Sequence, residues 1–227
     1  MSRLLLVRHA QSVWNAEARI QGQACRGLSD LGHRQAKALG EALAEELGHA
    51  GGPVRLVTSD LQRCRETVAP LCAHRGGEPE VDPRLRERSF GDWEGRLRED
   101  VATSDADRWD RFCAGHDVVH EVGGETAAQL GDRVEPVLRD LLAATPVAGV
   151  TVAVTHGGPV WQGLHRLLGL PLGALGGIAN AGITEVLRSG SGGVVLGRFN
   201  DVGHLDPALR TVFARPSSRR DGPPVGR

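Results

Sequence analysis

Short aliphatic runs alternate with longer amphipathic segments along most of the chain. Leu4–Val7, Val54–Asp60 (VRLVTSD) and Val150–Gly158 (VTVAVTHGG) are short and rich in aliphatic residues. This pattern is typical of strands that are buried on both faces of a sheet. Val81–Leu85 predicts a further, shorter strand.

Between these runs, apolar residues recur at the spacing of an amphipathic helix. In one segment they fall at positions 31, 36, 39, 43 and 47, and Gly48 ends the pattern. The same reasoning predicts a loop over 115–124 and helices over 31–47, 61–73, 97–112, 125–144 and 158–168.

Strands that alternate with helices predict an α/β fold, a three-layer α/β/α sandwich around a mostly parallel sheet. The segments 183–189 (ITEVLRS) and 193–199 (GVVLGRF) flank a Gly/Ser turn, so they predict an antiparallel hairpin at the edge. With 227 residues, we expect a single domain over 1–214 with a small cap-like insertion at about 96–122. Residues 215–227 are rich in Pro, Gly, Ser and Arg and predict a disordered tail.

Composition narrows the class of partner. The 27 basic and 28 acidic residues give a net charge of −1, so no overall attraction to nucleic acid or an anionic membrane is expected. Leu4–Val7 is too short for a signal peptide, and no apolar run is long enough to span a membrane. The cysteines lack CxxC spacing and are interpreted as reduced, buried thiols of a cytoplasmic protein: Cys25, Cys64, Cys72 and Cys113. Whether the chain forms a homodimer stays open.

Polar side chains follow three of the predicted strands. Arg8 and His9 follow the first, Ser59 and Arg63 follow the second, and His156 follows the strand that begins at Val150. Ligands of an open α/β sheet bind outside the carboxyl ends of its strands, so these groups are expected to converge. Arginine does not ligate metals, but its guanidinium group matches phosphate oxygens. The sequence therefore predicts a phosphate site without a metal.

This set of residues suits phosphoryl transfer. A neutral imidazole can attack phosphorus and carry the phosphoryl group, which divides one difficult displacement into two easier steps. Arg8 and Arg63 would lower the pKa of His9 and stabilise the charge on the transferring group. The departing alkoxide needs a proton, and an anionic phosphate favours the protonated form of a neighbouring carboxyl group.

Several stretches resemble the motifs of the histidine phosphatase superfamily, also called phosphoglycerate mutase-like. They occur in that family's order and extend from Leu4 to Gly158: LLLVRHAQSVWN, IQG, LSDLGHRQA, TSDLQRCRET, LRERSFGDWEG, GGET and VTHGG. A later stretch, FNDVGHL, is similar to a further element of the family. A single RHxxS match would be weak, but the ordered set is specific.

The resemblance implies a role for each matched residue. His9 becomes the phosphorylated nucleophile and Glu87 the proton donor that later activates water. The phosphate or substrate ligands would be Arg8, Arg63, His156, Asn15, Gln21, Gly22 and the backbone N–H of Gly157. The resemblance also implies that no metal ion or other cofactor is required.

The chain departs from the family pattern in its first motif and in one loop. Ala10 stands where the family usually has Gly, and Ser12 where it usually has Thr; Ser12 keeps the hydroxyl group. The segment 24–27 (ACRG) lacks the Asp and Pro often found ahead of LS. The loop contacts to substrate are therefore less certain than the phosphoryl chemistry.

Other residues have two interpretations. Glu94 and Glu125 are alternative acids, although a structural role and a helix-start role suit them better. The arginines 84, 86 and 88 could bind a second anion or form a solvated face, and Trp14 and Trp161 could line the pocket or belong to the core. The pair His116 and His120 has the i, i+4 spacing of metal ligands, but its surroundings argue against a helix.

The sequence favours a phosphomonoesterase that hydrolyses a small phosphorylated metabolite. A phosphoglycerate mutase is the first alternative; such mutases usually carry a longer basic insertion, whereas Arg96–Val122 is short and lacks lysine. The second is a non-catalytic protein that binds a phosphate ligand, although none of the expected catalytic groups is missing. The identity of the substrate does not follow from the sequence.

Overall fold

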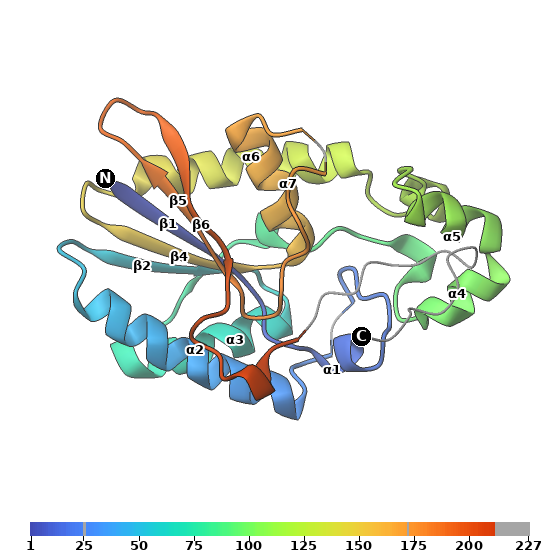
Figure 1. The fold of residues 1–227 in the computed structure, drawn as a ribbon, viewed down its shortest axis with the longest axis horizontal. Helices are drawn as coiled ribbons and strands as arrows, with labels where there is room; N and C mark the ends of the chain where they lie inside the picture. Colours follow the sequence, from blue (N-terminus) through green and yellow to red (C-terminus); the bar gives the residue numbers. More distant parts are fainter. Residues whose placement is uncertain (25, 172, 212–227) are drawn as a thin grey trace.

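The computed structural model describes residues 1–24, 26–171 and 173–211. Its strands form one six-stranded sheet in the order β3-β2-β4-β1-β5-β6 (Figure 1). Strands β1 to β4 run parallel to one another, whereas β5 runs antiparallel to both of its neighbours, β1 and β6. Their bounds are β1 Ser2–Arg8, β2 Val54–Thr58, β3 Glu80–Val81, β4 Val150–Thr155, β5 Ile183–Arg188 and β6 Val194–Asp201.

Helices cover both faces of this sheet, as the alternating pattern predicts. Helices α2 and α3 lie on one face, and α6 and α7 lie on the other (Figure 1). The helix bounds are α1 Val13–Ala16, α2 Asp30–Gly48, α3 Gln62–Arg75, α4 Arg98–Ser104, α5 Ala106–Cys113, α6 Ala127–Ala144 and α7 Gly157–Leu168. The predicted three-layer α/β/α fold with an antiparallel edge is confirmed.

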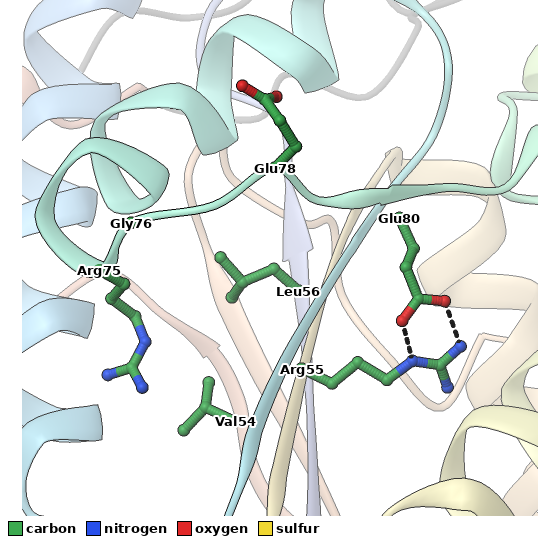
Figure 2. Close-up of a pocket in the computed structure, with 7 residues that line it drawn as sticks. All are labelled: Val54, Arg55, Leu56, Arg75, Gly76, Glu78 and Glu80. Carbon is green, nitrogen blue, oxygen red and sulfur yellow. Dashed lines mark hydrogen bonds and ion pairs between the residues drawn. The ribbon is translucent and has the colours of Figure 1, made fainter.

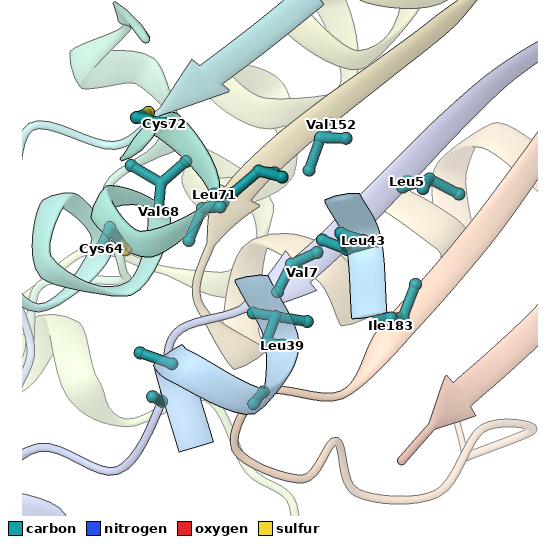
Figure 3. Packing of buried hydrophobic residues seen from close by; sticks show 14 of the residues in the cluster. Leu5, Val7, Leu39, Leu43, Cys64, Val68, Leu71, Cys72, Val152 and Ile183 are labelled. Atoms are coloured by element: carbon teal, nitrogen blue, oxygen red, sulfur yellow. The ribbon is translucent and has the colours of Figure 1, made fainter. Parts of the chain in front are cut away.

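Strand β1 shows how the two cores are built. Successive side chains of a strand point to opposite faces, so Leu5 and Val7 face α2 and α3 while Leu4 and Leu6 face α6 and α7. Figure 3 shows the first of these clusters, in which Leu39 and Leu43 of α2 lie over the sheet. Burying each such side chain contributes about 1.5–3 kcal/mol. The strand ends that carry the candidate site therefore stand on a rigid base.

The segment 96–122 lies beyond the carboxyl edge of the sheet and forms a separate hydrophobic cluster together with Ile20 and Trp93 (Figure 1). The prediction of one helix over 97–112 is wrong, because the backbone at Asp105 leaves the helical region with φ −136° and ψ 47°. Its carboxylate accepts a hydrogen bond from Trp93 Nε1 at 3.0 Å and forms an ion pair with Arg108. Asp105 therefore separates α4 from α5, and we call residues 96–122 the cap segment.

Two further expectations need correction. The strand predicted over Val81–Leu85 is limited to β3, Glu80–Val81, because Pro83 begins a 3-10 turn. The Asp82 side chain caps this turn by accepting a hydrogen bond from the Arg84 N–H. The loop predicted over 115–124 contains a 3-10 turn, Val119–Val122, that buries its two terminal valines. Two other short 3-10 turns span Gly91–Trp93 and Pro207–Leu209.

The hairpin of β5 and β6 is confirmed. The predicted tail, 215–227, lies outside the described residues, and the single-domain organisation stays a prediction. No helix in the part of the chain that the structure describes is both long and apolar enough to cross a membrane.

Candidate active site

The carboxyl ends of β1 and β4 are adjacent in the sheet, and they bring the two predicted histidines together. The ring centroids of His9 and His156 are 5.2 Å apart, with the rings edge to face. Beside them is a cavity of about 680 Å³. Its lining includes these predicted site residues: Arg8, His9, Asn15, Gln21, Gly22, Arg63, Glu87 and Gly157. His156 is fully buried next to this lining.

The orientation of His9 leaves one ring nitrogen available. Its Nδ1 lies 2.7 Å from the carbonyl oxygen of Ala10, which can only accept a hydrogen bond. The proton therefore lies on Nδ1, and Nε2 keeps its lone pair. The side chain is 2% exposed, and burial, followed by the charges of Arg63 and Arg8, holds the pKa of His9 well below its ordinary value. His9 is therefore neutral near pH 7, as nucleophilic attack requires.

His156 is held by groups from β2 and α3. Arg63 Nε donates a hydrogen bond to His156 Nδ1 at 3.1 Å, so the imidazole proton lies on Nε2, 3.0 Å from Ser59 Oγ. The Cys64 thiol lies 3.3 Å from the same nitrogen. Burial, the charge of Arg63 and then His9 and Arg8 hold the pKa of His156 well below its ordinary value.

Two arginines supply positive charge at this end of the sheet. Arg63 is fully buried and donates to the carbonyl oxygens of Gly22 at 2.8 Å and Ala24 at 3.1 Å. Arg8 donates to the carbonyl oxygen of Ile178. Burial lowers the pKa of Arg8 to about 10, so its guanidinium group is still charged at neutral pH. Buried cations of this kind favour an anionic ligand.

Glu87 lies against the start of helix α7. The backbone N–H of Gly158 donates to Glu87 Oε2 at 3.3 Å, and the N–H of Arg88 donates to Oε1 at 2.9 Å. A Cβ atom at position 158 would lie 2.2 Å from Glu87 Oε1, so only glycine leaves room for this carboxyl group. Gly157 lines the cavity at the first turn of α7, where free N–H groups and the helix dipole favour a phosphate.

The amide of Asn15 is also oriented. Its Oδ1 accepts hydrogen bonds from the Ser12 N–H at 3.3 Å and from Asn180 Nδ2 at 3.1 Å, which directs its own Nδ2 elsewhere as a donor. Ser12 caps helix α1, and its hydroxyl group also donates to Gln21 Oε1 at 2.7 Å. Serine therefore serves in the position where the related motif usually has threonine.

The motif geometry agrees with a comparison of the whole chain. Residues 4–202 match the family model described as "Histidine phosphatase superfamily (branch 1)". The chain belongs to the histidine phosphatase superfamily. The family identified from the sequence motifs is confirmed.

Relatives within this superfamily include phosphatases and mutases. A glucosyl-3-phosphoglycerate phosphatase of Mycolicibacterium vanbaalenii is 38% identical over 194 residues, which cover 79% of this chain and 81% of the relative. A probable phosphoglycerate mutase GpmB of Yersinia enterocolitica is 32% identical over 217 residues, 92% of this chain and 98% of the relative. Among solved structures, a mycobacterial glucosyl-3-phosphoglycerate phosphatase in complex with VO3 superposes with a TM-score of 0.74 at 31% identity, over 88% of this chain and 99% of that chain. The predicted enzyme class, a hydrolase of phosphate monoesters, is confirmed, and mutase activity is the lesser alternative.

The substitution of Ala10 for the usual glycine of the superfamily is accommodated. Its φ angle is not positive, its methyl group is fully buried in the cluster beneath α2, and its N–H donates to Thr67 Oγ1 at 3.0 Å. In the segment 24–27, which differs from the family pattern, the carbonyl oxygen of Ala24 accepts the hydrogen bond from Arg63. Cys25 lies outside the residues that the structure describes.

Both alternative acids have structural partners. The Glu94 carboxylate accepts hydrogen bonds from the N–H groups of Gln23 at 3.1 Å and Ala24 at 3.0 Å, which supports the loop around Gly22. Glu125 forms an ion pair with Arg133 at 2.7 Å. The structural interpretation of Glu94 is confirmed, and Glu87 is the acid that lines the cavity.

The arginines near Glu87 also have acidic partners. Arg84 pairs with Asp82, Arg86 with Asp60 and Arg88 with Asp117, although Arg88 also lines the cavity. Trp161 lines the cavity too, and Trp14 does not. Within 1–24, 26–171 and 173–211, no group of three or more His, Cys, Asp or Glu residues is arranged to hold a metal ion; the pair His116 and His120 belongs to no such group.

Sequence reasoning missed three residues of this site. Asn180 Nδ2 donates to the carbonyl oxygen of His9 at 3.1 Å as well as to Asn15. Arg98 of the cap segment and Gln162 of α7 line the cavity. Asn180 precedes an antiparallel strand that the sequence gives no reason to place beside β1. Gln162 could have been found from its spacing, because it comes four residues after Gly158 and so lies on the same face of the predicted helix.

A second hollow of about 360 Å³ lies at the start of β2, away from the carboxyl ends of the strands. Figure 2 shows its lining, in which Arg55 and Glu80 form a two-bonded ion pair between β2 and β3. It contains none of the predicted site residues. The cavity beside His9 is therefore the candidate active site.

Proposed function

We propose that this enzyme hydrolyses its substrate through a phosphohistidine on His9. The observation that carries the proposal is the state of that side chain: a neutral imidazole whose Nδ1 is occupied by the Ala10 carbonyl, beside Arg8 and Arg63. The free Nε2 lone pair is a nucleophile, and the two guanidinium groups provide the charge that attracts a phosphate.

In the first step, His9 Nε2 forms a bond to phosphorus while the bond from phosphorus to the substrate oxygen breaks. The Glu87 carboxyl group gives its proton to the departing alkoxide, and a neutral alcohol leaves. Arg8, Arg63, the amide of Asn15 and the N–H of Gly157 stabilise the charge on the three remaining oxygens. His156, whose proton lies on Nε2 beside the cavity, is assigned as a further donor to the same group.

In the second step, the Glu87 carboxylate takes a proton from water, and the water oxygen attacks phosphorus. The bond from phosphorus to His9 breaks, the imidazole regains its lone pair and inorganic phosphate leaves. Glu87 is then protonated again, ready for the next cycle. The residues needed for both steps are all in the chain, and no metal is used.

For the substrate, we propose a phosphate monoester that carries a second acidic group. Arg98 is half-buried and lines the cavity, and it forms no ion pair with a carboxylate of the described residues. A carboxylate on the substrate would balance its charge. Three relatives are named glucosyl-3-phosphoglycerate phosphatase, and glucosyl-3-phosphoglycerate carries a carboxylate. A cavity of about 680 Å³ has the size of small-molecule sites in general.

Mutase activity is a second candidate because of the GpmB relatives. A mutase must retain a second phosphorylated acceptor, which requires several free cations. In the cap segment, however, Arg108 and Arg111 are paired with Glu121, and Arg96 donates to Ser104. This pairing favours hydrolysis.

A chase experiment with labelled phosphoenzyme distinguishes the two activities. We expect the label to leave as inorganic phosphate in the presence of substrate, and we expect His9→Ala to abolish turnover of an aryl phosphate. Transfer of most of the label to another alcohol would instead establish a mutase. Tight binding of phosphoesters without turnover of any would establish a non-catalytic binding protein.

Location, binding partners and oligomeric state complete the proposal. We propose a cytoplasmic enzyme with a small-molecule substrate and no nucleic-acid partner, consistent with the net charge of −1. Formation of a homodimer is left to measurement of the mass in solution.

A further inference from the structure

Gln162 has a polar atom that the fold leaves without a partner. The residue lines the cavity and is 8% exposed. Its Nε2 donates to the carbonyl oxygen of Ala127 at 2.7 Å, whereas its Oε1 is buried and has no hydrogen-bond partner among the described residues. A buried acceptor in this state destabilises the fold unless a ligand supplies the missing donor.

The amide cannot satisfy both atoms by exchanging them. A carbonyl oxygen accepts only, so the nitrogen must face Ala127, and the oxygen must face the other side. Because the residue lines the cavity and its nitrogen is held by Ala127, Oε1 is the amide atom left for a ligand there. Gln162 Oε1 is therefore a hydrogen-bond acceptor that a donor group on the substrate could satisfy.

The position of Gln162 indicates which part of the substrate it would meet. Residues four apart on a helix lie on the same face, so Gln162 is one turn beyond Gly158, whose N–H binds Glu87. Glu87 protonates the departing alcohol in the proposed mechanism, so the alcohol part of the substrate lies on this side of the cavity. A phosphate monoester is mostly the dianion at pH 7 and then has no hydrogen to donate, whereas alcohol hydroxyl groups do.

The neighbouring wall suits a carbohydrate ring. Trp161 precedes Gln162 and lines the same cavity. Its indole N–H donates to the carbonyl oxygen of Leu175 at 3.4 Å, and its ring lies edge to face on His165 with centroids 4.1 Å apart. An indole anchored in this way offers a rigid apolar surface beside a hydrogen-bond acceptor.

We propose that Gln162 is a specificity-determining residue whose Oε1 accepts a hydrogen bond from a hydroxyl group on the alcohol part of the substrate. The substrate is then the phosphoester of a polyhydroxylated alcohol such as a sugar. This inference rests on the proposed function, because it assigns the alcohol to the side of Glu87. A site built to pair with a substrate hydroxyl discriminates against compounds that lack it, since its own polar group is then left unpaired.

The test compares Gln162→Met with the wild type on two substrates. One is glucosyl-3-phosphoglycerate, and the other is p-nitrophenyl phosphate, whose leaving group carries no further hydroxyl. Methionine keeps the length of the side chain and removes the acceptor. We expect kcat/KM for the glucosyl ester to fall at least tenfold more than kcat/KM for the aryl ester. The matched control is Gln62→Met, at an exposed position of α3 outside the cavity, where the amide donates to Glu66 Oε1 on the surface of the same helix.

Equal losses on the two substrates, with both still hydrolysed, would overturn the role of Gln162 and leave the proposed function intact. A wild-type enzyme that hydrolyses the glucosyl ester no better than the aryl ester would also overturn it. Failure of the proposed function looks different, because neither ester would then be hydrolysed at a rate that depends on His9. Thermal unfolding of both variants shows whether Gln162→Met is folded.

Discussion

At the scale of single residues, the proposed mechanism requires His9 and His156 to be neutral. A histidine in an unfolded chain titrates near pH 6.5, whereas burial and the nearby arginines hold the pKa of both residues well below that value. Between the two values the unfolded chain binds more protons than the folded one, so stability is lost as the pH falls below about 6.5. Each buried histidine contributes a slope of about 1 kcal/mol per pH unit there.

We therefore expect the free energy of unfolding in urea to decrease from pH 7 to pH 5, and to decrease less steeply in His9→Asn. The difference in slope should be about 1 kcal/mol per pH unit. His204, whose pKa burial also lowers, contributes equally to both proteins and cancels. Identical slopes would mean that folding does not lower the pKa of His9.

Asn180 is the residue whose role was least visible in the sequence. Its amide nitrogen binds both the His9 carbonyl and Asn15 Oδ1, and its oxygen accepts from the Thr211 hydroxyl at 3.1 Å. In Asn180→Asp a carboxylate oxygen would replace this nitrogen and face the His9 carbonyl and Asn15 Oδ1, which are both acceptors. We therefore expect kcat to fall at least tenfold. Thr211→Val removes only the outer bond and should cost much less. Equal kcat values for Asn180→Asp and the wild type would show that Asn180 does not position the site.

At the scale of elements, the start of α7 provides the sharpest contrast. A Cβ atom at position 158 would lie 2.2 Å from Glu87 Oε1, whereas one at 157 would lie 3.7 Å from Arg8 Nε, an ordinary contact. Gly158→Ala should therefore displace Glu87 and lower kcat/KM at least tenfold, while Gly157→Ala should have a much smaller effect. Circular dichroism and steady-state kinetics of the pair test this. A larger loss in Gly157→Ala would contradict the geometry.

The elements also show what the sequence could and could not predict. Strands β1, β2 and β4 are buried runs with polar residues at their carboxyl ends, so both their type and their convergence followed from the pattern. The division of α4 from α5 did not follow, because it depends on a tertiary bond between Trp93 and Asp105. The run Val81–Leu85 suggests a longer strand than β3, which ends at Val81 because Pro83 begins a 3-10 turn. The contacts of Asn180 could not be predicted, since they require the order of strands in the sheet.

At the scale of the whole molecule, the cap segment and the main sheet have separate hydrophobic clusters. Val101 is fully buried in the cap, and Leu43 lies buried between α2 and the sheet. Leu43→Ala should lower the free energy of unfolding, measured in urea, by about 2–5 kcal/mol.

Val101→Ala should chiefly increase proteolysis within 98–122. It should also raise KM, because Arg98, Trp109 and Phe112 line the cavity from that side. If Val101→Ala instead lowered the free energy of global unfolding in urea without increasing local proteolysis, the cap segment and the sheet would unfold as one unit.

The central claim is that His9 carries the phosphoryl group during turnover. The direct measurement is to stop the reaction with an aryl phosphate during steady state and to locate the phosphoryl group in the digested protein by mass spectrometry. We expect an acid-labile phosphoryl group on the peptide that contains His9, and none in His9→Ala. Turnover by the wild type with the phosphoryl group on another residue, or undiminished turnover by His9→Ala, would contradict it.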